Sequence, residues 1–254
     1  MTEDSKAYWA WLQLSLGEGS FKPKRILSYF PDIPSFYDAG PTQWRSLGLF
    51  TPKELKQLSQ NTLEDGKVLI ASNEEKGIQT ITPACKAYPQ RLYQIDNPPC
   101  MLYVKGTLPN LDEQPALAVV GTRNATTTGK QITYDLSMQL AQAGMVIISG
   151  GAKGIDTAAH QGALQGNGIS VCVLGCGIEY PYLMENESMR QSIAEHGAII
   201  SEFPVTKPAF KHHFPIRNRI ISGLSVGVLV VEAAERSGSL ITARTALEQN
   251  RDVF

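Results

Sequence analysis

Residues 149–156 read SGGAKGID and follow an apolar run. The segment contains three glycines, one lysine and one aspartate. We expect this segment to open a helix, and the free amides and dipole at a helix start attract phosphate. Glycine lets an anion approach the backbone and permits positive φ. Lys153 adds a positive charge, and Asp156 is expected to accept hydrogen bonds at the helix start rather than act as a catalytic acid. The segment is therefore predicted to hold an anion.

A second loop of this kind, GTRNATTTGK, follows the apolar run that ends at Gly121. A dinucleotide-binding turn needs a second glycine where this chain has Arg123. A P-loop needs a serine or threonine after its glycine–lysine pair, and here Gln131 follows Lys130. The sequence therefore argues against both common nucleotide-phosphate motifs and against ATP hydrolysis by a P-loop mechanism.

Charged residues are distributed unevenly along the chain. Residues 114–178 contain two acids, and residues 203–231 contain none although they carry Lys207, Lys211, Arg217 and Arg219. Several basic loops that converge on one crevice favour a polyanion over a single nucleotide. Phe210 and Phe214 lie within the basic stretch, as in proteins whose aromatic rings stack on the bases of single strands. Two other interpretations remain: the arginines could lie on a solvated helix face, and Phe214 could be a core residue.

Few residues are candidates for catalysis. Ser149, Asp156 and His160 are the three residue types of a hydrolase triad, but sequence spacing alone does not support one. His212 and His213 are adjacent, and neighbours on an extended chain point to opposite sides, which is poor geometry for one metal ion. No metal site and no cofactor are therefore expected.

Glu232 ends an apolar run and has two interpretations. It could act as a catalytic base, which would make the protein a nucleotide-binding or nucleotide-hydrolysing enzyme. It could instead hold Arg217, Arg219 or the SGS segment at residues 237–239 in place, which we favour.

These residues need a framework that brings loop ends together, and the chain from residue 116 onward provides one. Continuous β-branched runs alternate with helical segments, which is typical of a parallel sheet covered by helices on both faces. Ligands bind such sheets at the carboxyl ends of the strands, where the strand order reverses. The expected strands are 116–121, 145–151, 169–177, 198–203 and 226–233, the helices are 129–144, 154–166, 188–197, 217–225 and 240–250, and two short strands (78–82 and 101–106) and a short helix (89–95) precede them.

Residues 1–75 have a different pattern, with apolar residues three or four apart and glycines between segments. Thr51 and Glu54, on either side of Pro52, have the spacing of a capping box. We expect a small domain of four or five helices, which either contacts DNA backbones or simply packs. The boundary is expected between Gly66 and Gly77, with a second domain over residues 76–254.

The composition is that of a globular protein. Hydrophobic residues make up 43% and charged residues 19%, and the formal net charge of −1 gives the whole chain no basic signature. We identify no signal peptide and no apolar run long enough to span a membrane. The four cysteines form no CxxC pair, and Cys172 and Cys176 are expected to be buried free thiols. A cytoplasmic protein is the simplest expectation.

Five segments together resemble the DNA-processing protein A family (DprA, also called Smf): VVGTRNATTTGK, SGGAKGIDTAAHQGAL, VLGCGIEYPY, FPIRNRIISGLS and VVEAAERSGSLITARTALEQNRDVF. The resemblance runs from about Ile78 to Phe254. It implies an extended Rossmann-like domain preceded by a sterile-alpha-motif-like helical domain. Thr122 replaces the serine of the family's G-S-R turn, Gly151 stands where a larger apolar residue is usual, and Lys153 replaces arginine. Lysine keeps the charge but lacks the bidentate fork of arginine.

The resemblance implies a non-enzymatic protein of natural transformation. Such a protein binds and protects incoming single-stranded DNA and loads the recombinase RecA onto it. Family members form homodimers, and they continue beyond the equivalent of Phe254 into further sheet residues and often a winged-helix-like domain. The expected DNA-binding residues are Gly121, Thr122, Arg123, Ser149, Gly150, Gly151, Lys153, Gly154, Lys211, Phe214, Arg217, Asn218, Arg219, Ser237 and Ser239.

Two other classes of function remain open beside this one. The first is the Glu232-centred nucleotide enzyme described above. The second is a scaffold for a recombinase with little DNA contact of its own.

Overall fold

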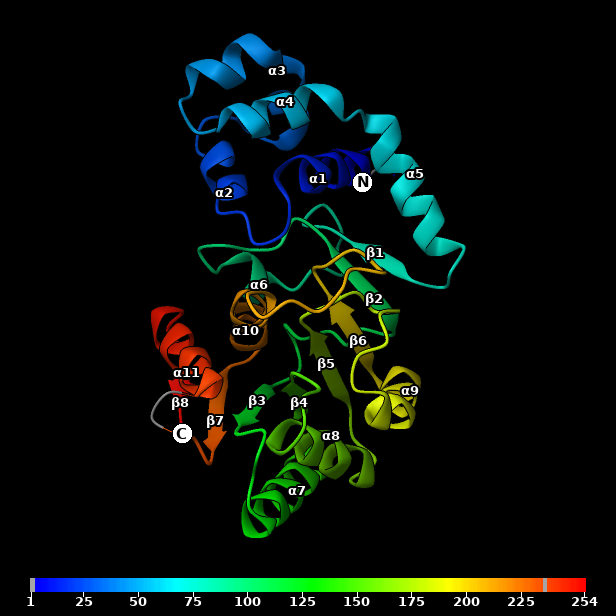
Figure 1. Ribbon diagram of the computed structural model, residues 1–254, viewed down its shortest axis with the longest axis vertical. Helices are drawn as coiled ribbons and strands as arrows, with labels where there is room; N and C mark the ends of the chain where they lie inside the picture. Colours follow the sequence, from blue (N-terminus) through cyan, green and yellow to red (C-terminus); the bar gives the residue numbers. More distant parts are fainter. Residues whose placement is uncertain (1–2, 235–236) are drawn as a thin grey trace. The chain divides into compact units, whose positions relative to one another are not determined.

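The computed structural model describes residues 3–234 and 237–254, which group into two compact units (Figure 1). The first unit runs to Tyr88 and includes Asp96–Leu102, and the second comprises Pro89–Ile95 and Tyr103–Phe254. The first unit thus continues past the boundary expected after residue 75. Whether each part folds alone stays a prediction.

The first unit is helical in its described part, with one short strand at its end. Thr51 caps a helix by accepting a hydrogen bond from the amide of Glu54 at 3.3 Å, and the Glu54 carboxylate accepts the Thr51 amide at 2.7 Å. This is the expected capping box, and Thr62 and Asp65 form a second one. The elements are α1 (Glu3–Leu16), α2 (Lys22–Leu27), α3 (Ile33–Ser46), α4 (Pro52–Gln60), α5 (Leu63–Glu74) and β1 (Gln79–Ile81).

Aromatic side chains form the core of the first unit. The rings of Trp11, Phe36 and Trp44 lie within 6.0 Å of one another, centroid to centroid. Both indole N–H groups are satisfied, because Trp11 donates to the carbonyl of Asn61 at 3.0 Å and Trp44 donates to that of Phe36 at 2.6 Å. Burying such rings requires a partner for each N–H, so these bonds fix how the helices meet.

The second unit contains a mixed sheet in which most strand pairs are parallel. Its strands follow the order β2-β6-β5-β4-β3-β7-β8. β2 runs antiparallel to β6, and the remaining pairs are parallel. The strands are β2 (Leu102–Gly106), β3 (Ala116–Gly121), β4 (Val146–Ser149), β5 (Ser170–Leu174), β6 (Ala198–Ser201), β7 (Gly227–Val231) and β8 (Asp252–Val253).

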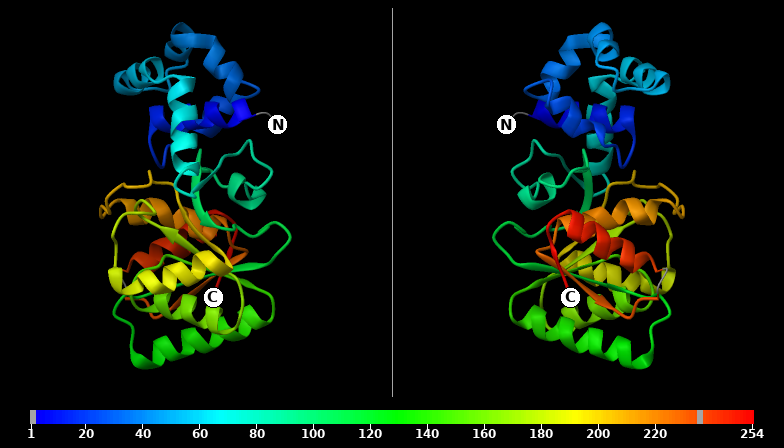
Figure 2. Two further views of the ribbon diagram at one scale, coloured as in Figure 1. Left: turned by 90° about the vertical axis from the view of Figure 1, so that its right-hand side faces the viewer. Right: turned by 90° about the vertical axis from the view of Figure 1, so that its left-hand side faces the viewer.

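Helices cover both faces of this sheet (Figure 2). α7, α8 and α9 pack on one face, and α10 and α11 pack on the other. The expected Rossmann-like architecture is therefore confirmed. The helices are α6 (Gln90–Tyr93), α7 (Thr127–Gln142), α8 (Ile155–Gln165), α9 (Glu187–His196), α10 (His213–Gly223) and α11 (Gly238–Glu248), with a short 3₁₀ turn, η1 (Met184–Asn186).

The local sequence explains where these elements begin and end. All five residues of β5, SVCVL, are buried, which is why the strand reads as one apolar run. α7 is followed by Gly144, whose φ of +86° is the left-handed conformation expected after a helix end. The thiols of Cys172 and Cys176 are free and buried, as expected. None of the described helices combines the length and apolarity needed to cross a membrane.

Candidate functional site

A cleft lies where the strand order reverses around β3. The chain continues from β3 to β4 on one side, whereas β7 pairs with β3 on the other. The cleft has a volume of about 290 Å³ and is bounded by the ends of β3 and β4 and by the starts of α10 and α11. It is lined by Val120, Gly121, Thr122, Arg123, Ala152, Asp156, Phe214, Pro215, Arg217, Asn218, Ile221, Ser237, Gly238, Ser239, Ile241 and Thr242.

Arg123 and Phe214 form an exposed cation–aromatic pair at this cleft. The guanidinium carbon of Arg123 lies 5.1 Å from the centroid of the half-buried Phe214 ring. The ring packs closely over Gly175, where an added Cβ would lie 2.9 Å from it. The Tyr182 ring lies 5.7 Å from the same centroid. Sequence analysis did not select Tyr182, although it belongs to the segment VLGCGIEYPY, whose aromatic residues were the available signal.

Arg217 is buried and joins the ends of two strands. One terminal nitrogen of its guanidinium donates to the carbonyl of Gly150 at 2.7 Å and also to that of Val173. Its Nε donates to the side-chain oxygen of Asn218 at 3.2 Å. An added Cβ on Gly150 would lie 2.3 Å from a guanidinium nitrogen of Arg217, so a larger residue there would force the guanidinium to move. Arg217 thus holds the loop after β4 to the end of β5.

Asp156 lies in the first turn of α8, where the sequence predicts a bound anion. Asp156 is buried, and its carboxylate accepts the amide of Ala152 at 3.2 Å. It therefore holds the loop before α8 and does not cap the helix, whose N-cap Gly154 receives no side-chain cap. Burial raises the pKa of Asp156, while the charge of Arg217 and the hydrogen bond from the amide lower it.

Gly154 connects the first two loops of the site. Its φ is +79°, and an added Cβ would lie 2.6 Å from the carbonyl oxygen of Arg123. The amide of Ile155 donates to the carbonyl of Thr122 at 3.3 Å. Glycine at this position therefore lets the loop after β4 rest against the loop that carries Arg123.

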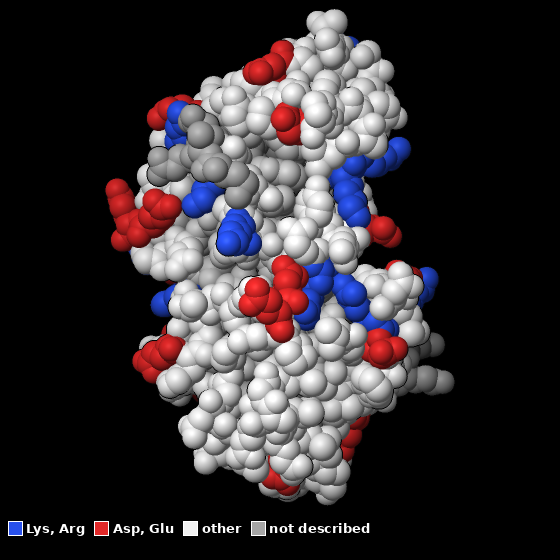
Figure 3. Space-filling view, turned by 180° about the vertical axis from the view of Figure 1, so that it is seen from behind, with Lys and Arg blue, Asp and Glu red and all other residues white. Residues whose placement is uncertain are grey.

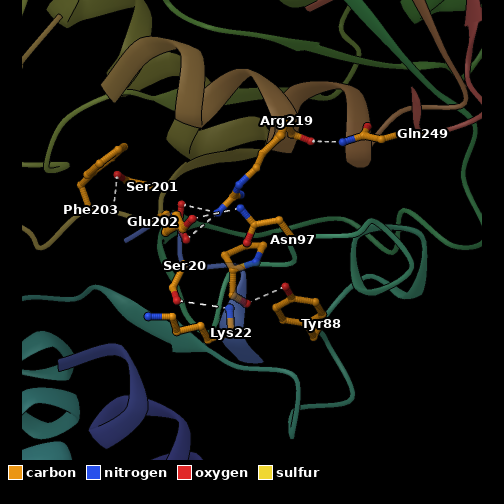
Figure 4. Close-up of polar contacts among 11 residues, drawn as sticks. Ser20, Lys22, Tyr88, Asn97, Ser201, Glu202, Phe203, Arg219 and Gln249 are labelled. Carbon is orange, nitrogen blue, oxygen red and sulfur yellow. Dashed lines mark hydrogen bonds and ion pairs between the residues drawn. The ribbon is translucent and has the colours of Figure 1, made fainter. Parts of the chain in front are cut away.

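Arg219 lies outside the residues that line the cleft. Its guanidinium donates to both carboxylate oxygens of Glu202, at 2.6 and 2.7 Å (Figure 4). Its backbone carbonyl accepts a hydrogen bond from the side chain of Gln249 at 3.1 Å. Arg217 and Arg219 are 4% and 8% exposed, so the interpretation that they lie on a solvated helix face is wrong.

Two lysines of the expected site are exposed and have different surroundings. Lys153 forms an ion pair with Glu185 at 2.5 Å, and both side chains are more than half exposed. The hydrogen bond from Lys153 lowers the pKa of Glu185. Lys211 is exposed in the segment just before α10. The three exposed cations among the expected residues are therefore Arg123, Lys153 and Lys211.

The remaining expected residues have structural contacts. The Ser149 hydroxyl donates to the carbonyl of Val119 at 2.7 Å, and Gly151 has a φ of +66°. At the start of α11 the hydroxyls of Ser237 and Ser239 lie 2.6 Å apart, and the Asn218 amide donates to the carbonyl of Gly238 at 3.2 Å.

The triad considered from sequence is not assembled. His160 is buried, and its Nδ1 lies 2.8 Å from the hydroxyl of Ser170 rather than beside Ser149. Burial and the charge of Arg217 lower the pKa of His160 to about 3, so its ring is neutral at pH 7. Among the described residues, no cluster of His, Cys, Asp or Glu has the geometry to hold a metal ion.

Glu232 stabilises the start of α7. Its carboxylate accepts the amide of Thr126 at 2.8 Å and the hydroxyl of the same residue. These bonds lower the pKa of Glu232. We expected Glu232 to hold Arg217, Arg219 or residues 237–239. It holds Thr126 instead.

The charge distribution on the surface is uneven, as the sequence suggests. Figure 3 shows Lys and Arg side chains gathered in groups, whereas the end of the second unit formed by α7 has little charge on this face. On a chain of net charge −1, these groups of cations are local features of the surface.

A family model described as DNA recombination-mediator protein A matches residues 79–254. The chain belongs to this family. It is 38% identical over 260 residues to Protein Smf of Synechocystis, covering 100% of this chain and 65% of the relative. It is 43% identical over 186 residues to DNA processing protein DprA of Bacillus subtilis, covering 73% of this chain and 63% of the relative. The chain thus spans about two thirds of the length of these DprA relatives.

Solved structures of DprA proteins have the same fold. The structure of DNA processing protein A from Streptococcus pneumoniae matches with a TM-score of 0.83 and 31% identity, covering 100% of this chain and 86% of that one. A structure from Helicobacter pylori matches with a TM-score of 0.63 and 34% identity, covering 69% of this chain and 80% of that one. The latter is described by its single-stranded DNA binding mode.

Proposed function

We propose that the cleft binds single-stranded DNA and performs no chemistry on it. The observation that carries the proposal is the exposed guanidinium of Arg123 lying 5.1 Å from the Phe214 ring centroid, with the Tyr182 ring beside it. A cation next to half-open aromatic rings matches a ligand that offers both phosphates and unpaired bases. The DprA relative from Helicobacter pylori, described by its single-stranded DNA binding mode, supports the same ligand class.

The site residues have separate roles in this proposal. Arg123, Lys153 and Lys211 contact phosphates because they are exposed cations. Phe214 stacks on a base. Arg217 is a positioning residue that keeps the loop after β4 in place. The other expected residues shape the cleft or its loops: Gly121, Thr122, Ser149, Gly150, Gly151, Gly154, Asn218, Arg219, Ser237 and Ser239.

Duplex DNA should bind more weakly than a single strand. Paired bases cannot reach an aromatic ring, and nothing in this cleft inserts a helix into a groove. With three phosphate contacts, the logarithm of the binding constant should fall with the logarithm of salt concentration with a slope of about −2, from about −0.7 per contact.

The test compares two single variants by fluorescence anisotropy on a labelled oligo-dT at several salt concentrations. Arg123→Ala should weaken binding and flatten the slope by about one contact. Phe214→Ala should weaken binding by about 1–3 kcal/mol and leave the slope nearly unchanged, because stacking releases no counterions. If Arg123→Ala retains wild-type affinity and slope while circular dichroism shows an intact fold, the cleft is not the DNA site.

We further propose the family's biological role for the whole protein. In this role the protein acts as a homodimer that protects incoming DNA during natural transformation and loads the recombinase RecA onto it. Membership of the DprA family supports this proposal. The test is whether the protein accelerates RecA filament assembly on single-stranded DNA, and whether Arg123→Ala, which should weaken DNA binding, also slows that assembly. Equal assembly rates with and without the wild-type protein would reject the loading role.

A further inference from the structure

Two aromatic side chains of the first unit are largely open to solvent. Phe21 is 68% exposed and Tyr29 is 61% exposed. The other described aromatic residues of this unit behave differently, because Tyr88 is 1% exposed and the rest belong to the aromatic core or pack against it. Folding of the unit therefore uses the other rings and leaves these two available.

Helical spacing places the two rings and an arginine along one side of α2 and its flanking turns. Phe21 precedes α2 with helical φ and ψ of −81° and −4°, and Ser28 follows it with −80° and −14°. The amide of Tyr29 donates to the carbonyl of Ile26 at 2.9 Å, so the turn continues to that residue. Residues four apart on a helix are surface neighbours, which places Phe21, Arg25 and Tyr29 in one row. We call these three residues the α2 row.

The segment around the α2 row is basic. The sequence from residue 21 to residue 30, FKPKRILSYF, contains three bases and no acid. Lys22 is occupied, because it pairs with Glu54 at 2.5 Å. Arg25 is exposed and forms no ion pair among the described residues. The row thus presents one cation between two rings.

This arrangement selects a particular kind of ligand. Open aromatic rings accept unpaired bases by stacking, and a guanidinium between them is placed for the phosphate that links such bases. A duplex offers phosphate but keeps its bases paired, so it could use only the arginine. We propose that the α2 row is a second contact site for single-stranded DNA. The proposal rests on the proposed function of the cleft, since it assigns the same ligand to the first unit.

A second site on the same chain changes how affinity depends on strand length. When one strand reaches both sites, the second contact forms at a high effective concentration. Oligonucleotides too short to reach both sites should bind with an affinity that does not depend on the α2 row. Longer ones should bind more tightly, and that gain should depend on the two rings.

The experiment measures binding of the full chain to oligo-dT of increasing length, by fluorescence anisotropy at one salt concentration. The variants are Phe21→Ala/Tyr29→Ala, the conservative Phe21→Tyr/Tyr29→Phe, and Val68→Ala as a control. Val68 is 59% exposed on α5 of the same unit, so it matches the removal of exposed apolar surface. Circular dichroism checks each fold.

The double alanine variant should lose the length-dependent gain and bind long oligo-dT about thirtyfold more weakly or worse, since the two stacks together contribute at least about 2 kcal/mol. The conservative variant and Val68→Ala should behave like the wild type. Arg25→Ala should flatten the salt dependence for long strands but not for short ones.

Three results would overturn the inference. One is an unchanged length dependence in the double alanine variant. Another is an equal loss for single-stranded and duplex DNA, which would show general attraction to phosphate. The third is loss of binding to anionic lipid vesicles with unchanged DNA binding, which would make the row a membrane contact. Failure of the proposed function looks different, because Arg123→Ala would then bind short oligo-dT as tightly as the wild type does.

Discussion

Arg217→Met is expected to destabilise the second unit strongly, because the guanidinium satisfies buried backbone groups. Arg217 donates to the carbonyls of Gly150 and Val173 and lies close enough to Asp156 to affect its pKa. A methionine fills similar volume but donates nothing. Removing one partner of such a buried charged network costs about 3–5 kcal/mol. At about 2–4 °C per kcal/mol for a domain of this size, the melting temperature should fall by about 6–20 °C.

The stability lost in Arg217→Met should depend on pH, because Asp156 titrates beside the arginine. Burial raises the pKa of this carboxyl, and the charge of Arg217 lowers it. Removing the arginine should therefore raise the pKa further. A carboxyl whose folded-state pKa exceeds its unfolded-state value costs stability as pH rises through the interval between the two values. The variant's loss of stability should therefore be larger at neutral pH than in acid.

The assay is chemical denaturation followed by circular dichroism, with Arg244→Met as the matched control. Arg244 lies on α11 of the same unit, its side chain is 83% exposed and it pairs with Glu248 on the surface. Its loss should change stability by about 0.5 kcal/mol or less. Suppose instead that Arg217→Met is as stable as the control but binds oligo-dT with a shallower salt slope. Arg217 would then be a phosphate ligand, and its assignment as a positioning residue would be refuted.

Three further outcomes are expected. Glu185→Gln should release Lys153 and tighten binding of oligo-dT about two- to fivefold in anisotropy titrations at low salt; the gain should disappear in a Lys153→Ala background, and a gain that persists there would mean general repulsion only. Glu232→Gln should lower the melting temperature, because it weakens the hydrogen bond to Thr126. Nucleotide hydrolysis should stay at background in both the wild type and this variant. Hydrolysis that only the wild type shows would support the enzyme alternative. A chain beginning at Gly77 should fold and still bind short oligo-dT, and an insoluble product would contradict the domain boundary.

The alternation of elements could be predicted because it depends on local patterns. A fully buried strand such as β5 is apolar along its length, and a helix end such as Gly144 needs a left-handed residue. The position of the cleft also followed, since the ends of parallel strands share one edge of a sheet. The strand order and the antiparallel pairing of β2 with β6 could not be predicted, because they depend on contacts between segments distant in sequence.

The roles of individual side chains were less predictable. Arg217 and Arg219 stand two positions apart in a basic segment and look equivalent in the sequence. In the structure one bonds to backbone carbonyls and the other to Glu202. Tyr182 reaches the site from a loop that contributed no residue to the expected set. Such partners are set by three-dimensional packing, and no spacing rule connects them.

Two glycines of the site are complementary in shape to side chains from a distant segment. Gly150 leaves room for the Arg217 guanidinium, and Gly175 leaves room for the ring of Phe214. Arg217 and Phe214 both belong to α10, so the loops after β4 and β5 are moulded around one helix. A larger residue at either glycine would force the facing side chain of α10 to move. Grafting or redesigning this site therefore requires exchanging both loops and α10 as a single cassette.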